Sequence, residues 1–369
     1  MLFFNDPSPK FRKLISNISD DMEAFIDSKQ FIKGKNVNLL EKKLSNFLEV
    51  NEFFGCANGT DAITIALLAS ELPEGSKIAI PAVTAPATAV SVIRAKMVPI
   101  IIDVNEMALM CFDSLDLAIS KEDIKGIIFV HLYGNVCDIE RIIDYKNKGY
   151  LTIEDCAQSF GSSMNSIYTG SVADFGTHSF YPTKNLSCPG DGGGISVGNC
   201  DEGLSKKIRM ISEYGWNKER KVILEGLNSR LDELHAKFLL KALNNFSQEL
   251  VDKQSLLNSL CRSIEAKESI KILSQSSDEN INVSPHLAVI DCEQPDIIEE
   301  LAIKHEISLG RHYEVPLPNH PFFKDTEAFF VRKNPIWTHI SNNTRSLPFF
   351  WGMNKIENTQ LMEFIDEIL

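Results

Sequence analysis

The sequence of 369 residues lacks the patterns that mark several classes of protein. Its eight cysteines include no CxxC pair, and some lie inside apolar runs, as Cys292 does. Closely paired cysteines are typical of disulfide frameworks and zinc sites, so we expect reduced thiols here. No HExxH motif or other ligand spacing indicates a metal site, and we predict none.

Long runs of a single residue type are also missing. No apolar run approaches the roughly 18 residues of a membrane-spanning helix, and the first residues, MLFFNDPSPKFRKL, do not resemble a secretion signal. The formal net charge is −13, and no long basic run occurs, so a nucleic-acid partner is not expected. These absences predict a soluble, cytoplasmic protein without a membrane partner.

The residues that are present form an ordinary globular composition, 44% hydrophobic and 24% charged, and the length predicts roughly two domains. Short apolar runs alternate with helical patterns such as 61–70 and 87–95, which is typical of a mainly parallel sheet covered on both faces. The expected strands are 77–81, 98–103, 126–131, 150–154, 177–181 and 194–197.

The pattern changes after about residue 245. Residues 232–267 predict one or two long amphipathic helices. A strand over 283–291, a helix over 295–304 and a closing helix over 358–369 follow. We therefore predict a large domain over residues 1–245 and a smaller α/β domain over 246–369.

Ligands bind beyond the carboxyl ends of the strands in such sheets, and several polar residues follow predicted strands. Asp103, His131 and Asp155 do so, and so does the turn that carries Lys184. For His131, a structural role is about as well supported as a position that faces the pocket.

Two stretches carry the strongest chemical signal. TIEDCAQSFG, residues 152–161, puts Asp155 after an apolar strand, where a carboxylate needs a partner such as a cationic ring nitrogen, or else caps a helix. Gln158 is either a hydrogen-bonding neighbour of Asp155 or a solvated side chain. HSFYPTKNLS, residues 178–187, puts Lys184 on a Pro-Thr turn. A desolvated lysine forms a Schiff base with an aldehyde, although most lysines lie on the surface.

A third stretch offers an anion site. Gly59 and Thr60 open a helical run, where free N–H groups and the helix dipole attract a phosphate, although an ordinary N-cap by Thr60 or Asp61 is the commoner explanation. The run PGDGGG at 189–194 lacks the spacing of a nucleotide-binding loop and more simply allows close backbone packing. An aldehyde, a ring nitrogen and a phosphate together describe pyridoxal phosphate (PLP).

The sequence resembles the DegT/DnrJ/EryC1/StrS family of PLP-dependent sugar aminotransferases. The matching stretches include NGTDAITIAL at 58–67, EDCAQ at 154–158, SFYPTKNL at 179–186 and NSRLDELHA at 228–236, with weaker matches to 323. The resemblance implies fold type I, with a mainly parallel seven-stranded sheet in the large domain. It implies L-glutamate as the amino-acid donor and a nucleotide-linked sugar with a ketone at C-3 or C-4 as the acceptor.

The same resemblance implies residue roles. Lys184 would hold PLP as a Schiff base and shuttle a proton, and Asp155 would pair with the ring nitrogen. Gln158 would lie near the ring hydroxyl, and His312 and Tyr313 near the substrate. The phosphate would lie among Gly59, Thr60, Ser179 and, from the neighbouring subunit of a homodimer, Asn228. Asn228 also has an ordinary explanation as a helix N-cap.

The chain departs from the family pattern at two positions. Most members have an aromatic residue that stacks on the cofactor where this chain has Ala85, and many have histidine where it has Pro318. Two other functions therefore stay open: a sugar dehydratase on the same scaffold, which Lys184 argues against, and a regulatory or scaffold protein without catalysis.

Overall fold

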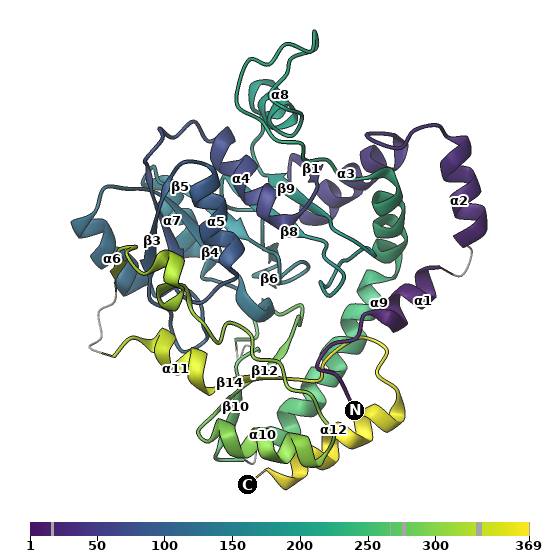
Figure 1. The fold of residues 1–369 in the computed structure, drawn as a ribbon, viewed down its shortest axis with the longest axis vertical. Helices are drawn as coiled ribbons and strands as arrows, with labels where there is room; N and C mark the ends of the chain where they lie inside the picture. Colours follow the sequence, from purple (N-terminus) through teal and green to yellow (C-terminus); the bar gives the residue numbers. More distant parts are fainter. Residues whose placement is uncertain (16–17, 266, 275–277, 330–333, 369) are drawn as a thin grey trace.

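A large mixed sheet forms the centre of the molecule in a computed structural model, which describes residues 1–15, 18–265, 267–274, 278–329 and 334–368 (Figure 1). The strand order is β1-β9-β8-β5-β4-β2-β3-β13. β9 runs antiparallel to β1 and β8, and the other neighbours are parallel. The strands are β1 Glu52–Cys56, β2 Lys77–Pro81, β3 Val98–Ile102, β4 Ile124–Val130, β5 Leu151–Asp155, β8 Phe175–Ser179, β9 Gly193–Val197 and β13 Ala328–Phe329.

The mainly parallel α/β sheet that we predicted is confirmed, and its strand count is corrected from seven to eight. The eighth strand is β13, a pair of residues far along the chain that adds to the edge of β3. The strand β1 was not among those expected, because its five residues, EFFGC, lie between helices and give no long pattern.

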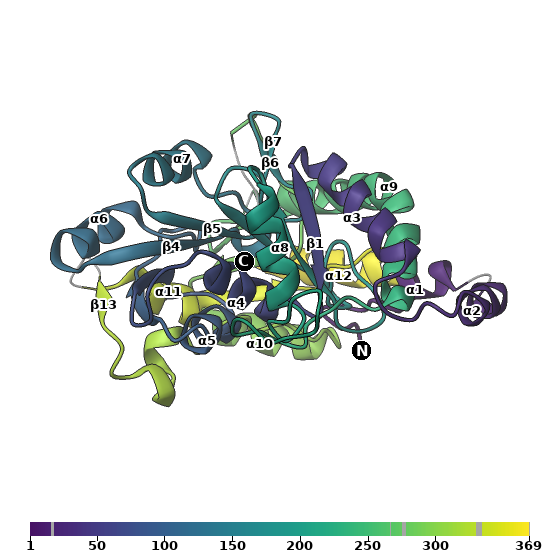
Figure 2. The same ribbon diagram turned by 90° about the horizontal axis from the view of Figure 1, so that it is seen from above.

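Helices cover both faces of the sheet. Figure 2 shows α6 and α7 on one side of β4 and β5, and α4 and α5 on the other. α4 is apolar around most of its circumference because it is buried between the sheet and other helices. The helices are α1 Ser8–Leu14, α2 Ile18–Asp27, α3 Lys35–Leu48, α4 Gly59–Ala69, α5 Pro86–Arg94, α6 Phe112–Lys121, α7 Ile139–Asn147, α8 Glu202–Ile211, α9 Glu233–Ile264, α10 Pro295–Lys304, α11 Ile336–Asn343 and α12 Lys355–Glu367, with 3-10 turns η1 Leu132–Gly134, η2 Leu317–Asn319 and η3 Pro321–Phe323.

A second, smaller sheet lies at the end of the molecule that holds both termini (Figure 1). It consists of β10 Ile270–Ile272, β12 Ala288–Cys292 and β14 Thr344–Leu347, all antiparallel. α10 and α12 pack with it around a separate apolar core that includes Ile290, Phe349 and Phe364. A third sheet is formed by the two-residue strands β6 Ser163–Met164, β7 Ile167–Tyr168 and β11 Ile281–Asn282.

The helix α9 connects the two cores. Its 32 residues run without a break through position 245, where we predicted the domain boundary, and the first half packs on α3 while the second joins the smaller core. Leu2 also belongs to the smaller core and bonds the backbone of Glu306 and Ser308. The domain division stays a prediction. Among the described residues, we find no helix with the length and apolar character needed to cross a membrane.

Candidate active site

The start of α4 and the end of β8 approach each other closely at the carboxyl edge of the large sheet. A Cβ added to Gly59 would lie 2.9 Å from Cβ of Ser179, and one added to Gly193 would lie 2.4 Å from the carbonyl carbon of Asn58. Glycine is therefore required at both positions. The close backbone packing that we predicted for the glycine-rich run is confirmed at Gly193.

The first turn of α4 presents the features of an anion site. Its N-cap is Asn58, whose side chain accepts a hydrogen bond of 2.8 Å from the N–H of Asp61, so the capping residue is neither Thr60 nor Asp61 as the ordinary explanation had it. The N–H groups at the start of a helix have no intrahelical partner. Gly59, Thr60 and the hydroxyl of Ser179 therefore surround a position that suits a phosphate group.

Asp155 ends β5 and is buried, with only 6% of its surface exposed. Its Oδ1 accepts from the N–H of Ala157 at 3.1 Å, and its Oδ2 accepts weakly from Thr88 at 3.4 Å. Burial raises the pKa of Asp155, while the Ala157 amide and the charge of Lys184 act in the opposite direction. Asp155 does not cap a helix, and its carboxylate has capacity for a cationic partner.

Lys184 lies on a turn directly after β8, closed by a hydrogen bond of 2.8 Å from its own N–H to the carbonyl of Tyr181. The side chain is half-buried and has no hydrogen bond among the described residues. Burial lowers the pKa of Lys184 to about 8, and the charge of Asp155 opposes this shift. An amine that loses its proton near neutral pH can act as a nucleophile.

Gln158 is buried and fully engaged, which excludes the solvated side chain that was one of our two interpretations. Its Oε1 accepts from the N–H of Tyr133 at 2.7 Å, and its Nε2 donates to the hydroxyl of Tyr313 at 2.7 Å. The rings of Tyr133 and Tyr313 stack with centroids 6.2 Å apart. Gln158 therefore joins the turn after β5 to the segment between α10 and η2, which carries Tyr313.

His312 lies close enough to Lys184 for the charge of that lysine to affect its pKa. Its Nδ1 is 2.6 Å from the hydroxyl of Ser346, and its ring meets Phe4 edge to face. Burial, together with the charge of Lys184, lowers the pKa of His312 to about 4. The imidazole is therefore neutral at physiological pH, and it can exchange hydrogen bonds with an uncharged substrate group.

Asn228 is exposed, and its backbone pairs with Glu213. The helix α9 begins at Glu233 with Asp232 as its N-cap, so the explanation of Asn228 as a helix cap is wrong. The side chain of Asn228 is therefore not used to cap a helix.

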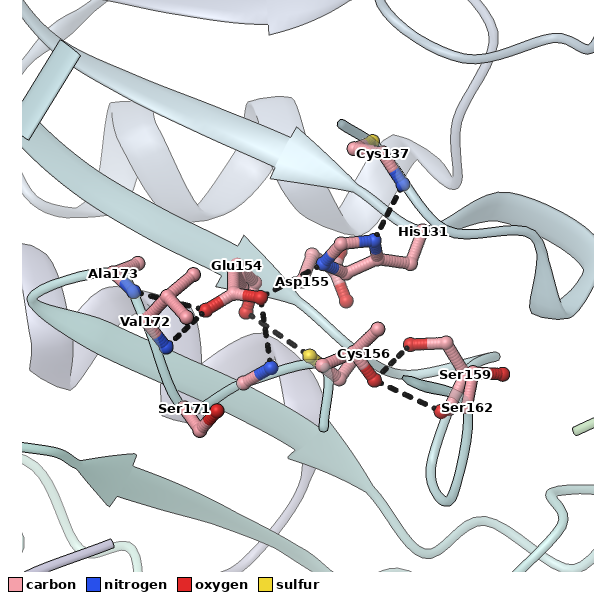
Figure 3. A network of polar contacts seen from close by, with 12 residues as sticks. His131, Cys137, Glu154, Asp155, Cys156, Ser159, Ser162, Ser171, Val172 and Ala173 are labelled. Atoms are coloured by element: carbon pink, nitrogen blue, oxygen red, sulfur yellow. Dashed lines mark hydrogen bonds and ion pairs between the residues drawn. The ribbon is translucent and has the colours of Figure 1, made fainter. Parts of the chain in front are cut away.

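A buried network lies next to Asp155 (Figure 3). Glu154 accepts hydrogen bonds of 2.9–3.0 Å from the N–H groups of Gly170, Val172 and Ala173 and one of 3.1 Å from Nε2 of His131. Nδ1 of His131 accepts from the N–H of Cys137 at 3.0 Å, so Nε2 carries the proton of a neutral ring. Of our two interpretations of His131, the structural role is therefore the one that the structure shows.

Ligand atoms of His131, Glu154 and Cys156 lie within 4.8 Å of one another, a spacing that metal sites share. The lone pairs of Glu154 are already used by four donors, as Figure 3 shows. The group therefore acts as an anchor for the loop at 170–173.

Asp103, another strand-end residue, is also structural. Its carboxylate accepts from the N–H groups of Ile336 and Trp337 at 3.1 Å each, at the first turn of α11.

The sequence did not predict three neighbours of the functional site. Thr88 contacts Asp155, and Asn185 and Ser284 are hydrogen-bonded to each other at 2.8 Å beside Lys184. Only the position of Asn185, next to Lys184, offered a signal.

Together these residues fit PLP. The carboxylate of Asp155 is close enough to the amine of Lys184 to influence the pKa of that amine. The start of α4, where Gly59 has no side chain, lies at the same edge of the sheet. The fold agrees. A DegT DnrJ EryC1 StrS aminotransferase from Brucella abortus superposes with a TM-score of 0.91 over 98% of each chain at 24% identity. NtdA from Bacillus subtilis with bound cofactor PMP gives 0.85 over 96% of this chain and 82% of that one at 26% identity.

The fold and the site thus define a PLP-dependent aminotransferase. The chain belongs to the DegT/DnrJ/EryC1/StrS aminotransferase family, whose sequence model matches residues 13–366. A pleiotropic regulatory protein of Geobacillus stearothermophilus is 30% identical over 98% of this chain and 97% of its own. UDP-2-acetamido-2-deoxy-3-oxo-D-glucuronate aminotransferase of Pseudomonas aeruginosa is 29% identical over 94% and 95%.

Proposed function

We propose that the protein transfers the amino group of an amino acid, L-glutamate, to the ketone of a nucleotide-linked deoxy sugar, with Lys184 and Asp155 as the catalytic residues. The observation that carries the proposal is the half-buried amine of Lys184, whose pKa is lowered, close to the charge of the buried carboxylate of Asp155. Neighbouring groups of opposite charge with perturbed pKa values are typical of catalytic sites.

PLP, when bound, supplies an aldehyde that takes up amino groups and a ring that withdraws electrons from the carbon being deprotonated. Lys184 serves this chemistry because a pKa of about 8 leaves a useful fraction of neutral amine near pH 7.5. Its Nζ takes the proton from the α-carbon of the amino donor and returns a proton in the second half-reaction. The carboxylate of Asp155 holds the proton on the ring nitrogen.

The other residues bind and orient. The N–H groups of Gly59 and Thr60 and the hydroxyl of Ser179 hold the phosphate, where the helix dipole adds to the attraction. Gln158, which is held by hydrogen bonds to Tyr133 and Tyr313, would lie beside the ring hydroxyl of bound PLP. His312, neutral and close to Lys184, donates or accepts a hydrogen bond with the sugar.

The substrate assignment is supported by the relative from P. aeruginosa, whose name describes a UDP-linked sugar with a 3-oxo group. This favours C-3 over C-4 as the site of amination. The product would be an amino sugar nucleotide.

We further propose a cytoplasmic homodimer with shared active sites. None of the eight cysteines, all in the described part of the chain, forms a disulfide, as is usual in reducing compartments. The segment after α8 projects beyond the sheet (Figure 1) and exposes Val222 by 68% and Ile223 by 59%, close in sequence to the exposed Asn228. Apolar side chains on a projecting segment are typical of an interface, here one that brings Asn228 to the partner's phosphate site.

A regulatory function is the second candidate, because the relative from G. stearothermophilus is named a regulatory protein. The test that separates the two is incubation with L-[15N]glutamate and UDP-linked 3-keto or 4-keto sugars, followed by mass spectrometry. The proposal expects 15N in the sugar with wild type and none with Lys184→Ala, while Lys43→Ala, on the exposed face of α3, retains activity. No label with any donor or ketone, despite bound PLP, would favour regulation.

A further inference from the structure

Asn185, the residue that follows Lys184, is held by polar contacts on every side. Its Nδ2 donates to the carbonyl and the hydroxyl of Ser284 at 2.9 and 2.8 Å. Its Oδ1 accepts from Nζ of Lys253 at 2.9 Å, and its main-chain carbonyl accepts from Nζ of Lys10 at 2.6 Å. Only 9% of the residue is exposed, so these bonds take the place of most of its contacts with water.

The three partners come from three separate parts of the fold. Lys10 lies on α1, Lys253 on the long helix α9, and Ser284 on the segment between β11 and β12. The N–H of Ser284 is fixed in turn by the hydroxyl of Ser162 at 2.8 Å. The position of Asn185 is therefore determined by the N-terminal helix, the connecting helix and the segment between β11 and β12 at once.

The two lysines are placed at a cost to stability. Lys10 is 6% exposed and lies 3.3 Å from Glu249, which is 4% exposed and has one carboxylate oxygen without a hydrogen bond. Lys253 has the neutral Asn185 as its acceptor and lies over the ring of Phe349 at 5.1 Å. Burial, with the charge of Lys10 added, lowers the pKa of Lys253 to about 7.

Apolar side chains of similar volume would hold these elements together at least as well as buried ions. What the lysines add is direction, because each donates to one defined oxygen of Asn185. The Lys184 turn has a single internal backbone bond, and the Lys184 side chain has no hydrogen bond of its own among the described residues. The turn thus depends on the neighbouring residue for its orientation.

We propose that Asn185 is a positioning residue that aims the amine of Lys184 at the cofactor site, and that Lys253 and Lys10 hold Asn185 for this purpose. The inference rests on the proposed role of Lys184 as the Schiff-base lysine. It assigns α1 and α9 a part in the reaction, although neither carries a catalytic residue.

Two variants remove either one of the contacts or all those of the Asn185 side chain. Lys253→Met deletes the donor to Oδ1, and Asn185→Ala deletes the whole side chain. Lys253→Arg restores a donor at the same position. Lys237→Met is the matched control, because Lys237 is also on α9 and also ties it to the N-terminal region, 3.0 Å from Asp21, without touching Asn185.

The first readout uses the cofactor-free protein. Acetylation of Lys184 by acetic anhydride, followed by peptide mass spectrometry across pH 6–11, gives the pKa of this one amine. We expect that pKa to rise by about one unit toward the ordinary lysine value in Lys253→Met and Asn185→Ala, since a freed side chain is better hydrated. Lys253→Arg and Lys237→Met should match wild type.

The second readout is the half-reaction of the PLP-loaded protein with glutamate. Misdirection of the amine should lower the maximal rate by about 10- to 100-fold in Lys253→Met and leave the glutamate KM within about twofold, with recovery in Lys253→Arg. Unchanged pKa and rate in folded Lys253→Met would overturn the positioning role. If Asn185→Ala does not fold, the two Lys253 variants decide.

The failure of the underlying function is recognised separately. If wild-type Lys184 forms no borohydride-stable adduct with PLP, the catalytic role of Lys184 is wrong. If wild type forms it and the Lys253 and Asn185 variants behave like wild type in both readouts, only the positioning role is wrong.

Discussion

The side-chain amide of Gln158 donates a hydrogen bond of 2.7 Å to the hydroxyl of Tyr313 and so joins the turn after β5 to the segment between α10 and η2. Tyr313 has a positive φ of 62°, a conformation that costs a bulky residue free energy and needs such an external contact to persist. The contact spans 155 positions of the sequence, and it fixes Tyr313 against the large core, which also includes Tyr133.

Gln158→Leu and Tyr313→Phe should therefore be non-additive. Each change breaks the same bond, so the double variant should lose less stability than the sum of the single variants, by about 1 kcal/mol. Urea unfolding of the four cofactor-free proteins measures this coupling. Strict additivity would mean that the bond does not form in solution.

Asp155→Asn should make the amine of Lys184 easier to deprotonate. The carboxylate of Asp155 stabilises the ammonium form, so its removal lowers the pKa of Lys184 below the value of about 8 in wild type. The pH dependence of Lys184 acetylation should shift to lower pH. Glu122 pairs with Lys77 on another part of the sheet, so Glu122→Gln should leave the pH dependence of Lys184 acetylation unchanged. A shift to higher pH in Asp155→Asn would contradict the proposed interaction between Asp155 and Lys184.

Glu154→Gln should destabilise the fold by about 2–4 kcal/mol, because an amide group cannot accept all four hydrogen bonds that the buried carboxylate accepts. Burial alone would raise the pKa of Glu154, but His131 and the amides of Ala173 and Gly170 hold it below the ordinary value.

The same carboxylate makes stability depend on pH. A depressed folded-state pKa stabilises the protein above the unfolded value of 4.5, and the contribution disappears as the pH falls through the folded value. Denaturation series between pH 7 and pH 3 should show a fall for wild type that is weaker in Glu154→Gln. Equal slopes would assign the acid sensitivity to other groups.

Ala85→Phe should strengthen PLP binding. Ala85 lies at the N-cap of α5, where most family members carry an aromatic residue, and a stacked ring adds about 0.5–1.5 kcal/mol, or roughly two- to tenfold in affinity. Absorbance titration of the cofactor-free protein measures the change, with Ala85→Leu as the control for bulk. Weaker binding would indicate that another side chain already occupies that face.

Subunit mixing tests the shared site. Lys184→Ala and Asn228→Ala should each be inactive or weak alone. In a mixed dimer one site combines an intact Lys184 with the partner's intact Asn228, so an equal mixture should recover about a quarter of wild-type activity. Recovery is not expected if both residues of a site come from one chain.

The sequence predicted the elements that have strong local signals. The buried strands of the parallel sheet and helices such as α10 are found where their patterns placed them, because apolar runs and helix periodicity are local properties. Lys184 and Asp155 follow β8 and β5, and parallel neighbours bring those two strand ends to one edge.

Contacts that depend on distant pairing could not be predicted. β13 joins β3 across more than two hundred residues, and Asp103 is used by a helix that begins at Ile336. Apart from its position next to Lys184, Asn185 gives no local sign of its importance, since its partners lie 175, 99 and 68 positions away. Such contacts arise only when the tertiary structure assembles.

The most direct test that Lys184 binds PLP as a Schiff base is to load the protein with PLP, reduce it with borohydride and sequence the labelled peptide by mass spectrometry. The account predicts a single phosphopyridoxyl group on Lys184, with none in Lys184→Ala and none when glutamate is added before reduction. A label on another lysine, or no label beside a visibly bound cofactor, would contradict it.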